Sequence, residues 1–282
     1  MSTRGWFRHT ALALGLAFLY IPILSMMVFS FNNSRMVTVW DSVNSPTLRW
    51  YVRLFENEQL LGAAWISLQI AAMTATGAVI LGTLAGLVLT RFGPFRGRAL
   101  LSAMTTAPLV MPEIIMGIAM LLLFVSLEQL IGWPTGRGML TIVIAHITFT
   151  MAYVTVVIQS RLAGFDDALE EAARDLGARP VTVFFRITLP LIAPALVSGW
   201  LLAFTLSWDD VVISQFVAGP GSSTLPMEIF SRVRRGVSPD INALATIMVL
   251  IVATGVVAST VWMKRQERKR LLEEQMARSD AG

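Results

Sequence analysis

The sequence of 282 residues contains no cysteine and only two histidines, His9 and His146. The absence of cysteine excludes disulfide bonds, thiol catalysis and zinc–thiolate sites. Two histidines are too few for a metal centre built on imidazole ligands. The sequence therefore predicts no metal site, no cofactor and no catalytic residue.

Charged residues are also scarce, at 14% of the sequence, whereas an average soluble protein has roughly 25%. Hydrophobic residues make up 55%, and the mean hydropathy is +0.67. This composition predicts a multi-pass protein of the lipid membrane. The net charge of +4 therefore does not predict a nucleic-acid partner. In a membrane protein the basic residues are expected mainly to set the topology.

A third absence concerns nucleotides. The phosphate-binding pattern G-x-x-x-x-G-K-[ST] occurs nowhere in the sequence. If ATP drives this protein, another chain must bind it.

Six apolar stretches are long enough to cross the roughly 30 Å hydrocarbon core of a bilayer. We therefore predict an all-α membrane protein with six transmembrane helices, in a single domain over 1–282 with a core at about 60–262. Two prolines, Pro108 and Pro112, interrupt the third stretch. The six stretches lie near 10–31, 62–90, 100–127, 139–160, 191–213 and 241–263.

The polar segment after the first span contains Trp50 and Leu54 at helical spacing. This spacing predicts an amphipathic helix at the outer interface, and a solvated loop is the alternative. Six spans place both termini on one side of the membrane. Basic residues are more numerous on that side, so the termini and the loop 164–190 are predicted to be cytoplasmic.

The loop 164–190 is the longest charged interval between two apolar stretches. Asp167 is a candidate N-cap, with Glu170 completing a capping box. Gly177 stands where a C′ glycine would end this helix.

A second short helix is expected to follow in the same loop. Pro180 is suited to its first position, and the helix is expected to run to Arg186. Pro190 is predicted to stand where this helix gives way to the next apolar stretch.

The same loop carries a specific spaced pattern: E-A-A, three residues, G, nine residues, then I-x-L-P. It resembles the coupling loop of the permeases of binding-protein-dependent ABC importers. The resemblance implies that the loop seats in a groove of a cytoplasmic ATPase. The matching positions are Glu171, Ala172, Ala173, Gly177, Ile187, Leu189 and Pro190.

Three carboxylates lie within or at the ends of predicted spans, where an ionisable group is expensive and indicates function. Glu113 follows the proline break, and Asp209 and Asp210 lie late in the fifth span. We predict that they line a substrate route, which would suit a cation. Alternatively, Glu113 pairs with a basic residue or is protonated, and the aspartates face outside water. His146 is interpreted as a hydrogen-bonded packing residue.

The resemblance extends over most of the chain, and is strongest to the permeases of polyamine importers, in particular those for putrescine. The segments that carry it are SFNNSR at 30–35, TLRWYVRLF at 47–55, TAPLVMPEIIMG at 106–117 and the long segment that begins LSWDDVVISQF, at 206–247.

This resemblance implies a type I importer permease in a bacterial inner membrane, without enzymatic activity of its own. It further implies three kinds of partner: a second, homologous permease subunit, an ATPase dimer and a periplasmic polyamine-binding protein.

Three alternatives remain open at this stage. One is an importer permease for another small solute, such as spermidine or an amino acid. Another is an intramembrane hydrolase, which would need a nucleophile and a base on facing spans. His146 is the only histidine within a predicted span, and no motif supports Ser102, Ser126 or Ser198 as nucleophile. The last is a structural membrane scaffold.

Overall fold

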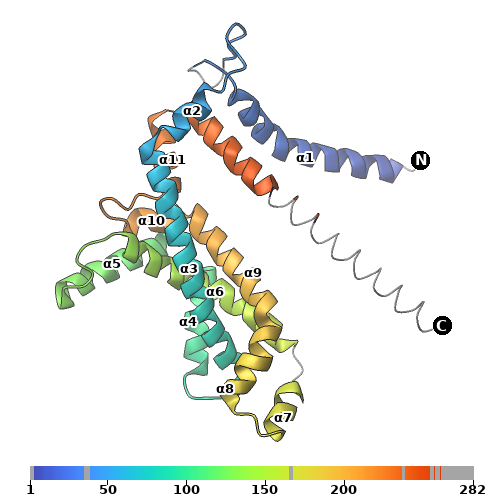
Figure 1. The fold of residues 1–282 in the computed structure, drawn as a ribbon, viewed down its shortest axis with the longest axis vertical. Coiled ribbons are helices and arrows are strands. Elements are labelled where there is room, and N and C mark those ends of the chain that lie inside the picture. Colours follow the sequence, from blue (N-terminus) through green and yellow to red (C-terminus); the bar gives the residue numbers. More distant parts are fainter. Residues whose placement is uncertain are drawn as a thin grey trace. The chain divides into compact units, whose positions relative to one another are not determined.

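The computed structural model describes residues 3–34, 39–164, 168–236 and 239–254, together with 257 and 261 (Figure 1). Within these ranges every regular element is helical. The elements are α1 (Thr3–Phe29), α2 (Arg49–Phe55), α3 (Glu58–Arg91), α4 (Arg98–Val110), α5 (Glu113–Ile131), α6 (Met139–Ala163), α7 (Ala168–Asp175), α8 (Pro180–Val183), a π-helical turn (Phe184–Thr188), α9 (Leu189–Asp209), α10 (Val212–Val217) and α11 (Leu225–Arg235).

The chain divides into two compact units. The larger unit is Gln59–Ser231, and the smaller one combines Met1–Glu58 with Arg232–Gly282. All of the predicted site residues belong to the larger unit.

Five helices in the described part of the chain are long and apolar enough to cross a membrane. A further apolar helix, Pro239–Thr254, is shorter, and the predicted span at 241–263 extends beyond the described residues. The five helices are Trp6–Phe29, Glu58–Arg91, Glu113–Ile131, Met139–Ala163 and Pro180–Asp209.

The third predicted span is divided into two helices. Helix α4 ends at Val110 because Met111 precedes a proline and takes an extended backbone, with ψ at 135°. Pro112 is also extended, and α5 begins at Glu113. The break therefore puts a carboxylate in the first turn of an apolar helix, where the helix dipole favours negative charge.

Small residues allow α3, α6 and α9 to pack closely in the larger unit. A Cβ atom added to Gly82 of α3 would lie 2.9 Å from Cβ of Val154, and one on Gly199 of α9 would lie 3.2 Å from its Cγ1. Gly86, one turn beyond Gly82, meets Ile158 in the same way at 3.0 Å. Val154 is therefore held between two glycine faces, an arrangement suited to helix packing in lipid.

The polar segment of the smaller unit forms a helix, α2, so the helix is confirmed over the solvated loop, and its position at the outer interface stays a prediction. Trp50 and Leu54 are buried, as their spacing predicted. Trp50 Nε1 donates a hydrogen bond to the carbonyl of Asn32 at 2.6 Å. The guanidinium groups of Arg49 and Arg53 each lie 5.4 Å from the centre of the indole ring, within cation–π range.

We predict that Gly82→Ala destabilises the protein, because the new methyl group would overlap Val154 and the helices would have to separate. Overpacking of this kind costs roughly 1–3 kcal/mol. The melting temperature of the detergent-purified protein should fall by several degrees.

Gly62→Ala is the matched control on the same helix, since nothing lies within 4 Å of a Cβ at Gly62. Alanine is the better helix former, so this variant should melt at or above the wild-type temperature. Equal melting temperatures for the two variants would contradict the packing described here.

Candidate functional site

Helix α7 and the glycine that ends it form the first half of the charged loop. The N–H of Gly177 donates to the carbonyl of Arg174 at 2.8 Å, and the N–H of Ala178 donates to that of Ala173 at 3.0 Å. These two bonds are those of a Schellman motif with Gly177 at C′. Its φ of +83° favours glycine, so the predicted helix stop is confirmed. The predicted N-cap, Asp167, lies outside the described residues.

The second half of the loop differs from the prediction. Pro180 takes the first position of α8, as predicted, but the helix does not give way at Pro190. It continues through the π-turn at Phe184–Thr188 into α9.

The physical reason lies in the proline itself. Pro190 lacks an N–H, and its ring would clash with the carbonyl of Arg186 in a regular α-helix. The wider turn relieves this conflict, and the N–H of Leu189 donates to the carbonyl of Phe184, five residues earlier.

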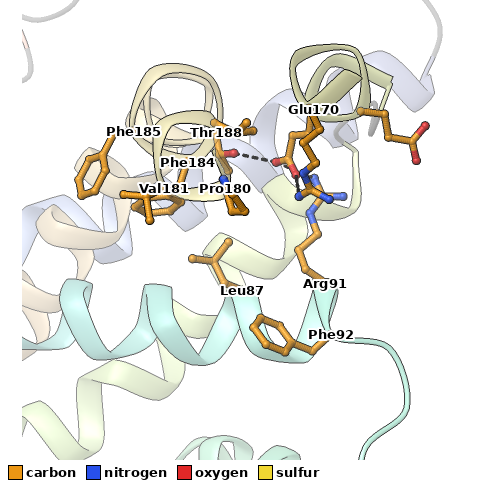
Figure 2. A pocket seen from close by; sticks show the side chains of 12 residues that line it. Leu87, Arg91, Phe92, Glu170, Pro180, Val181, Phe184, Phe185 and Thr188 are labelled. Atoms are coloured by element: carbon orange, nitrogen blue, oxygen red, sulfur yellow. Dashed lines mark hydrogen bonds and ion pairs between the residues drawn. The ribbon is translucent and has the colours of Figure 1, made fainter. Parts of the chain in front are cut away.

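A groove of about 530 Å³ lies between the end of α3 and the loop. Figure 2 shows its lining side chains, which come from α3, α7, α8 and the π-turn. Among them are Leu87, Arg91, Phe92, Glu170, Arg174 and Phe184.

One carboxylate, that of Glu170, joins three elements at this groove (Figure 2). Its Oε1 accepts a hydrogen bond from the Thr188 hydroxyl at 2.7 Å and lies 3.6 Å from Nη2 of Arg91. Its Oε2 lies 3.5 Å from Nη2 of Arg174, one turn along α7. Glu170 is buried, so these partners replace the water that the carboxylate gives up.

The loop also exposes large apolar side chains, two of which, Val181 and Phe185, line the groove. Leu176 is 88% exposed, and Val181 and Phe185 are both more than half exposed. Together with the exposed carboxylate of Glu171 they form what we term the docking surface. Apolar groups concentrated on a short polar loop are typical of a surface that a partner covers.

The residues of the spaced pattern differ in exposure. Four are exposed and the other three are half-buried. The exposed ones are Glu171, Ala172, Gly177 and Pro190, and the half-buried ones are Ala173, Ile187 and Leu189.

A second cluster lies at the opposite end of α9. The carboxylate of Asp210 accepts hydrogen bonds from the backbone N–H of Ile213 at 3.2 Å and of Ser214 at 2.8 Å. It thereby caps the start of α10. Asp210 also lies 3.1 Å from Nε2 of His146 on α6.

His146 completes this buried network. Because the carboxylate accepts hydrogen bonds, Nε2 donates to it, and Nδ1 pairs with the Ser207 hydroxyl at 2.8 Å. His146 is fully buried, so its interpretation as a hydrogen-bonded packing residue is confirmed. The sequence did not indicate that its partners are Ser207, Asp210 and Ser214, which lie more than 60 positions away along the chain.

The two neighbouring aspartates therefore have different environments. Asp209, the last residue of α9, is exposed and has no hydrogen-bond or ion-pair partner among the described residues. Asp210 is 8% exposed. Glu113 is exposed on α5, which packs against α10 through Gly117 and Phe216.

The connectivity of Ser207, His146 and Asp210 resembles that of a hydrolase triad. However, Ser207 is 6% exposed and His146 is 0% exposed, so the nucleophile has no room for a substrate carbonyl. Ser198 donates its hydroxyl to the carbonyl of Pro194 instead. The geometry therefore gives no support to an intramembrane hydrolase. Within the described ranges no three His, Asp or Glu side chains gather as a metal site would require.

Comparison with known proteins places this arrangement in a family. The model of the family described as "Binding-protein-dependent transport system inner membrane component" matches residues 78–271. The chain belongs to this family. It is thus a membrane-embedded permease component and not an enzyme.

Curated relatives cover nearly the whole permease. It is 54% identical over 277 residues to the putrescine transport system permease protein PotI of Escherichia coli K12, covering 98% of this chain and 97% of the relative. It is 44% identical over 257 residues to the spermidine/putrescine transport system permease protein PotC of Haemophilus influenzae, covering 91% and 96%.

Solved structures show that the permease has the type I importer fold. A bacterial ABC transporter that imports alginate aligns with a TM-score of 0.69 at 15% identity, covering 93% of this chain and 97% of that one. The MetNI methionine ABC transporter aligns with a TM-score of 0.57 at 17% identity, covering 71% and 92%.

We predict that His146→Leu destabilises the permease, because it removes a hydrogen-bond donor from a buried carboxylate. A buried acceptor that loses a hydrogen-bond donor destabilises the folded protein by roughly 1–3 kcal/mol, and by more when the acceptor is charged. The melting temperature of the purified protein should fall accordingly.

The double variant His146→Leu/Asp210→Asn supplies the matched control, since it removes the charge but keeps the acceptor that caps α10. It should melt above His146→Leu alone. A double variant that is no more stable than the single one would show that the buried charge is not responsible.

Proposed function

We propose that this permease is one of two membrane-spanning subunits of an ATP-driven importer that moves polyamines, putrescine first among them, from the periplasm to the cytoplasm. The observation that carries the proposal is the docking surface on α7, α8 and the π-turn. The names of the relatives supply the substrate class.

The docking surface is suited to a partner that performs the energy-yielding step. The chain has no phosphate-binding lysine motif, so the ATP is bound by another polypeptide. The exposed Leu176, Val181 and Phe185 offer apolar anchors, and Glu171 offers a charge, for a groove in one ATPase chain. The homologous permease subunit would hold the second ATPase chain. Closure of the ATPase dimer would then displace the pattern residues from Glu171 to Pro190.

The orientation follows from this assignment. An ATPase in the cytoplasm requires the loop 164–190 on that side, and the positive-inside rule puts both termini there as well. The periplasmic polyamine-binding protein then delivers substrate to the outer side, at which α9 ends in Asp209.

The exposed carboxylates support a cationic substrate. Asp209 has no partner among the described residues and ends a helix that carries three partly exposed aromatic rings. Phe204 stacks on Trp200 with ring centres 5.2 Å apart and on Trp208 at 5.9 Å. A helix that carries a carboxylate and aromatic rings is suited to an alkylammonium group, because the carboxylate offers charge pairing and the rings offer cation–π contact. We assign Asp209 and Glu113 to the substrate route, and Asp210 to the support of α10.

The deciding experiment measures ATP hydrolysis by the complete reconstituted transporter. Hydrolysis should rise only when the binding protein and putrescine are both present. If hydrolysis rises only with a binding protein that carries another solute, the protein is an importer permease but its substrate is not a polyamine. No stimulation under any ligand would favour the scaffold alternative.

We predict that Gly177→Val abolishes uptake while the protein still inserts into the membrane. A β-branched residue adopts the φ of +83° at this position only at a cost of at least about 1–2 kcal/mol. The turn that ends α7 would therefore change its backbone conformation, and α7 would no longer bind in the groove of the ATPase.

Gly177→Asn is the control, because asparagine tolerates this backbone region. A Cβ here would meet nothing within 4 Å in the permease itself, so this variant should retain most of the uptake. Normal uptake by Gly177→Val would contradict the coupling role of the loop.

We predict that Asp209→Asn raises the KM for putrescine uptake by roughly tenfold, which corresponds to a loss of about 1.4 kcal/mol in binding. The charge is removed without a change of shape. Asp209→Glu should retain more of the uptake, and uptake that is unchanged by Asp209→Asn would remove this residue from the route.

A further inference from the structure

Glu170 and Glu171 are neighbours in the sequence but have opposite environments. Glu171, which belongs to the spaced pattern, is exposed on the docking surface. Glu170, which does not, is 9% exposed and turned toward the rest of the permease (Figure 2). A buried carboxylate cannot serve as a contact for an outside partner, so its role is internal.

The contacts of Glu170 span the parts that must move together when the loop is displaced. It belongs to α7, accepts a hydrogen bond from Thr188 at the end of the π-turn, and pairs with Arg91 at the end of α3. Thr188 is itself 3% exposed, so this hydrogen bond is sheltered from water and is stronger than an exposed one.

The chain itself offers only a compliant connection between α7 and α9. From the C′ glycine to Arg179 the backbone is not helical, and the π-turn that follows is the place where the long helix departs from regular geometry. Turns of this kind are common at functional sites and at bends. A displacement of α7 transmitted only through these segments would be partly lost as bending.

We propose that the hydrogen bond from Thr188 to Glu170 is the joint that carries the displacement of α7 directly to the base of α9. Glu170 is thus a positioning residue for coupling, and Arg91 holds it against α3. This inference rests on the proposed function, since it assumes that an ATPase displaces α7.

The test uses the complete reconstituted transporter and compares two variants of Thr188. Thr188→Val keeps the shape of the side chain but removes the hydroxyl, whereas Thr188→Ser keeps the hydroxyl. Basal ATP hydrolysis and assembly with the ATPase should be unchanged in both, because the side chain is buried and does not belong to the docking surface.

The expected difference lies in coupling. For Thr188→Val, the number of putrescine molecules taken up per ATP hydrolysed should fall at least fivefold, while Thr188→Ser should remain within twofold of wild type. Glu170→Gln keeps an acceptor for the hydroxyl and removes the charge that faces Arg91, so it should couple better than Glu170→Ala. A merely structural role would lower assembly and basal hydrolysis together and leave this ratio unchanged.

The outcomes separate this inference from the proposed function. A wild-type complex without stimulated hydrolysis would overturn the proposed function. If hydrolysis by the wild type is stimulated and Thr188→Val takes up as much putrescine per ATP as the wild type, only the proposed role of the Thr188–Glu170 hydrogen bond is overturned. Should Thr188→Val assemble poorly, Thr188→Ala removes the same hydroxyl without putting a methyl group in its place, and it is judged by the same ratio.

Discussion

The low polarity of the membrane interior is the constraint on which the rest of this structure depends. A charged or polar group there must find a partner within the protein or lie where a helix ends. Accordingly, the carboxylates of the larger unit gather at breaks and termini: Glu113 follows the proline break and Asp209 and Asp210 lie at the end of α9. Two of its buried carboxylates, those of Glu170 and Asp210, are hydrogen-bonded.

The continuous helix Pro180–Asp209 connects the two candidate regions of the permease (Figure 1). It has 30 residues, or about 45 Å at the usual rise of an α-helix. One end lies at the docking surface and the other carries the exposed carboxylate. Beyond the π-turn, α9 is a single helix of 21 residues, which is suited to relay a displacement from its base to its other end.

Neighbouring residues of the same chemical type have different roles in both regions. Glu171 and Asp209 are exposed, and their carboxylates remain available to an ATPase and a cation in the proposed function. Glu170 and Asp210, each adjacent to one of them, are buried and hold elements together. In both pairs the inner residue fixes the backbone from which the outer one projects.

The sequence by itself determined the helical class, the interrupted third span, the C-terminal end of α7 and the start of α8. These features follow from local rules: apolar length, the missing N–H of proline and the tolerance of glycine for positive φ. The loop pattern identified the family because its residues are close together along the chain.

Only the tertiary structure decided which carboxylate of each pair is buried, that His146 meets Ser207 and Asp210, and that Glu170 meets Thr188 and Arg91. It also showed that Pro190 is accommodated by a π-turn. Most of these outcomes depend on contacts between segments far apart in the sequence. The outcome at Pro190 depends on whether a widened helical turn or a break in the helix has the lower free energy. Neither the type of a residue nor its neighbours along the chain specifies them.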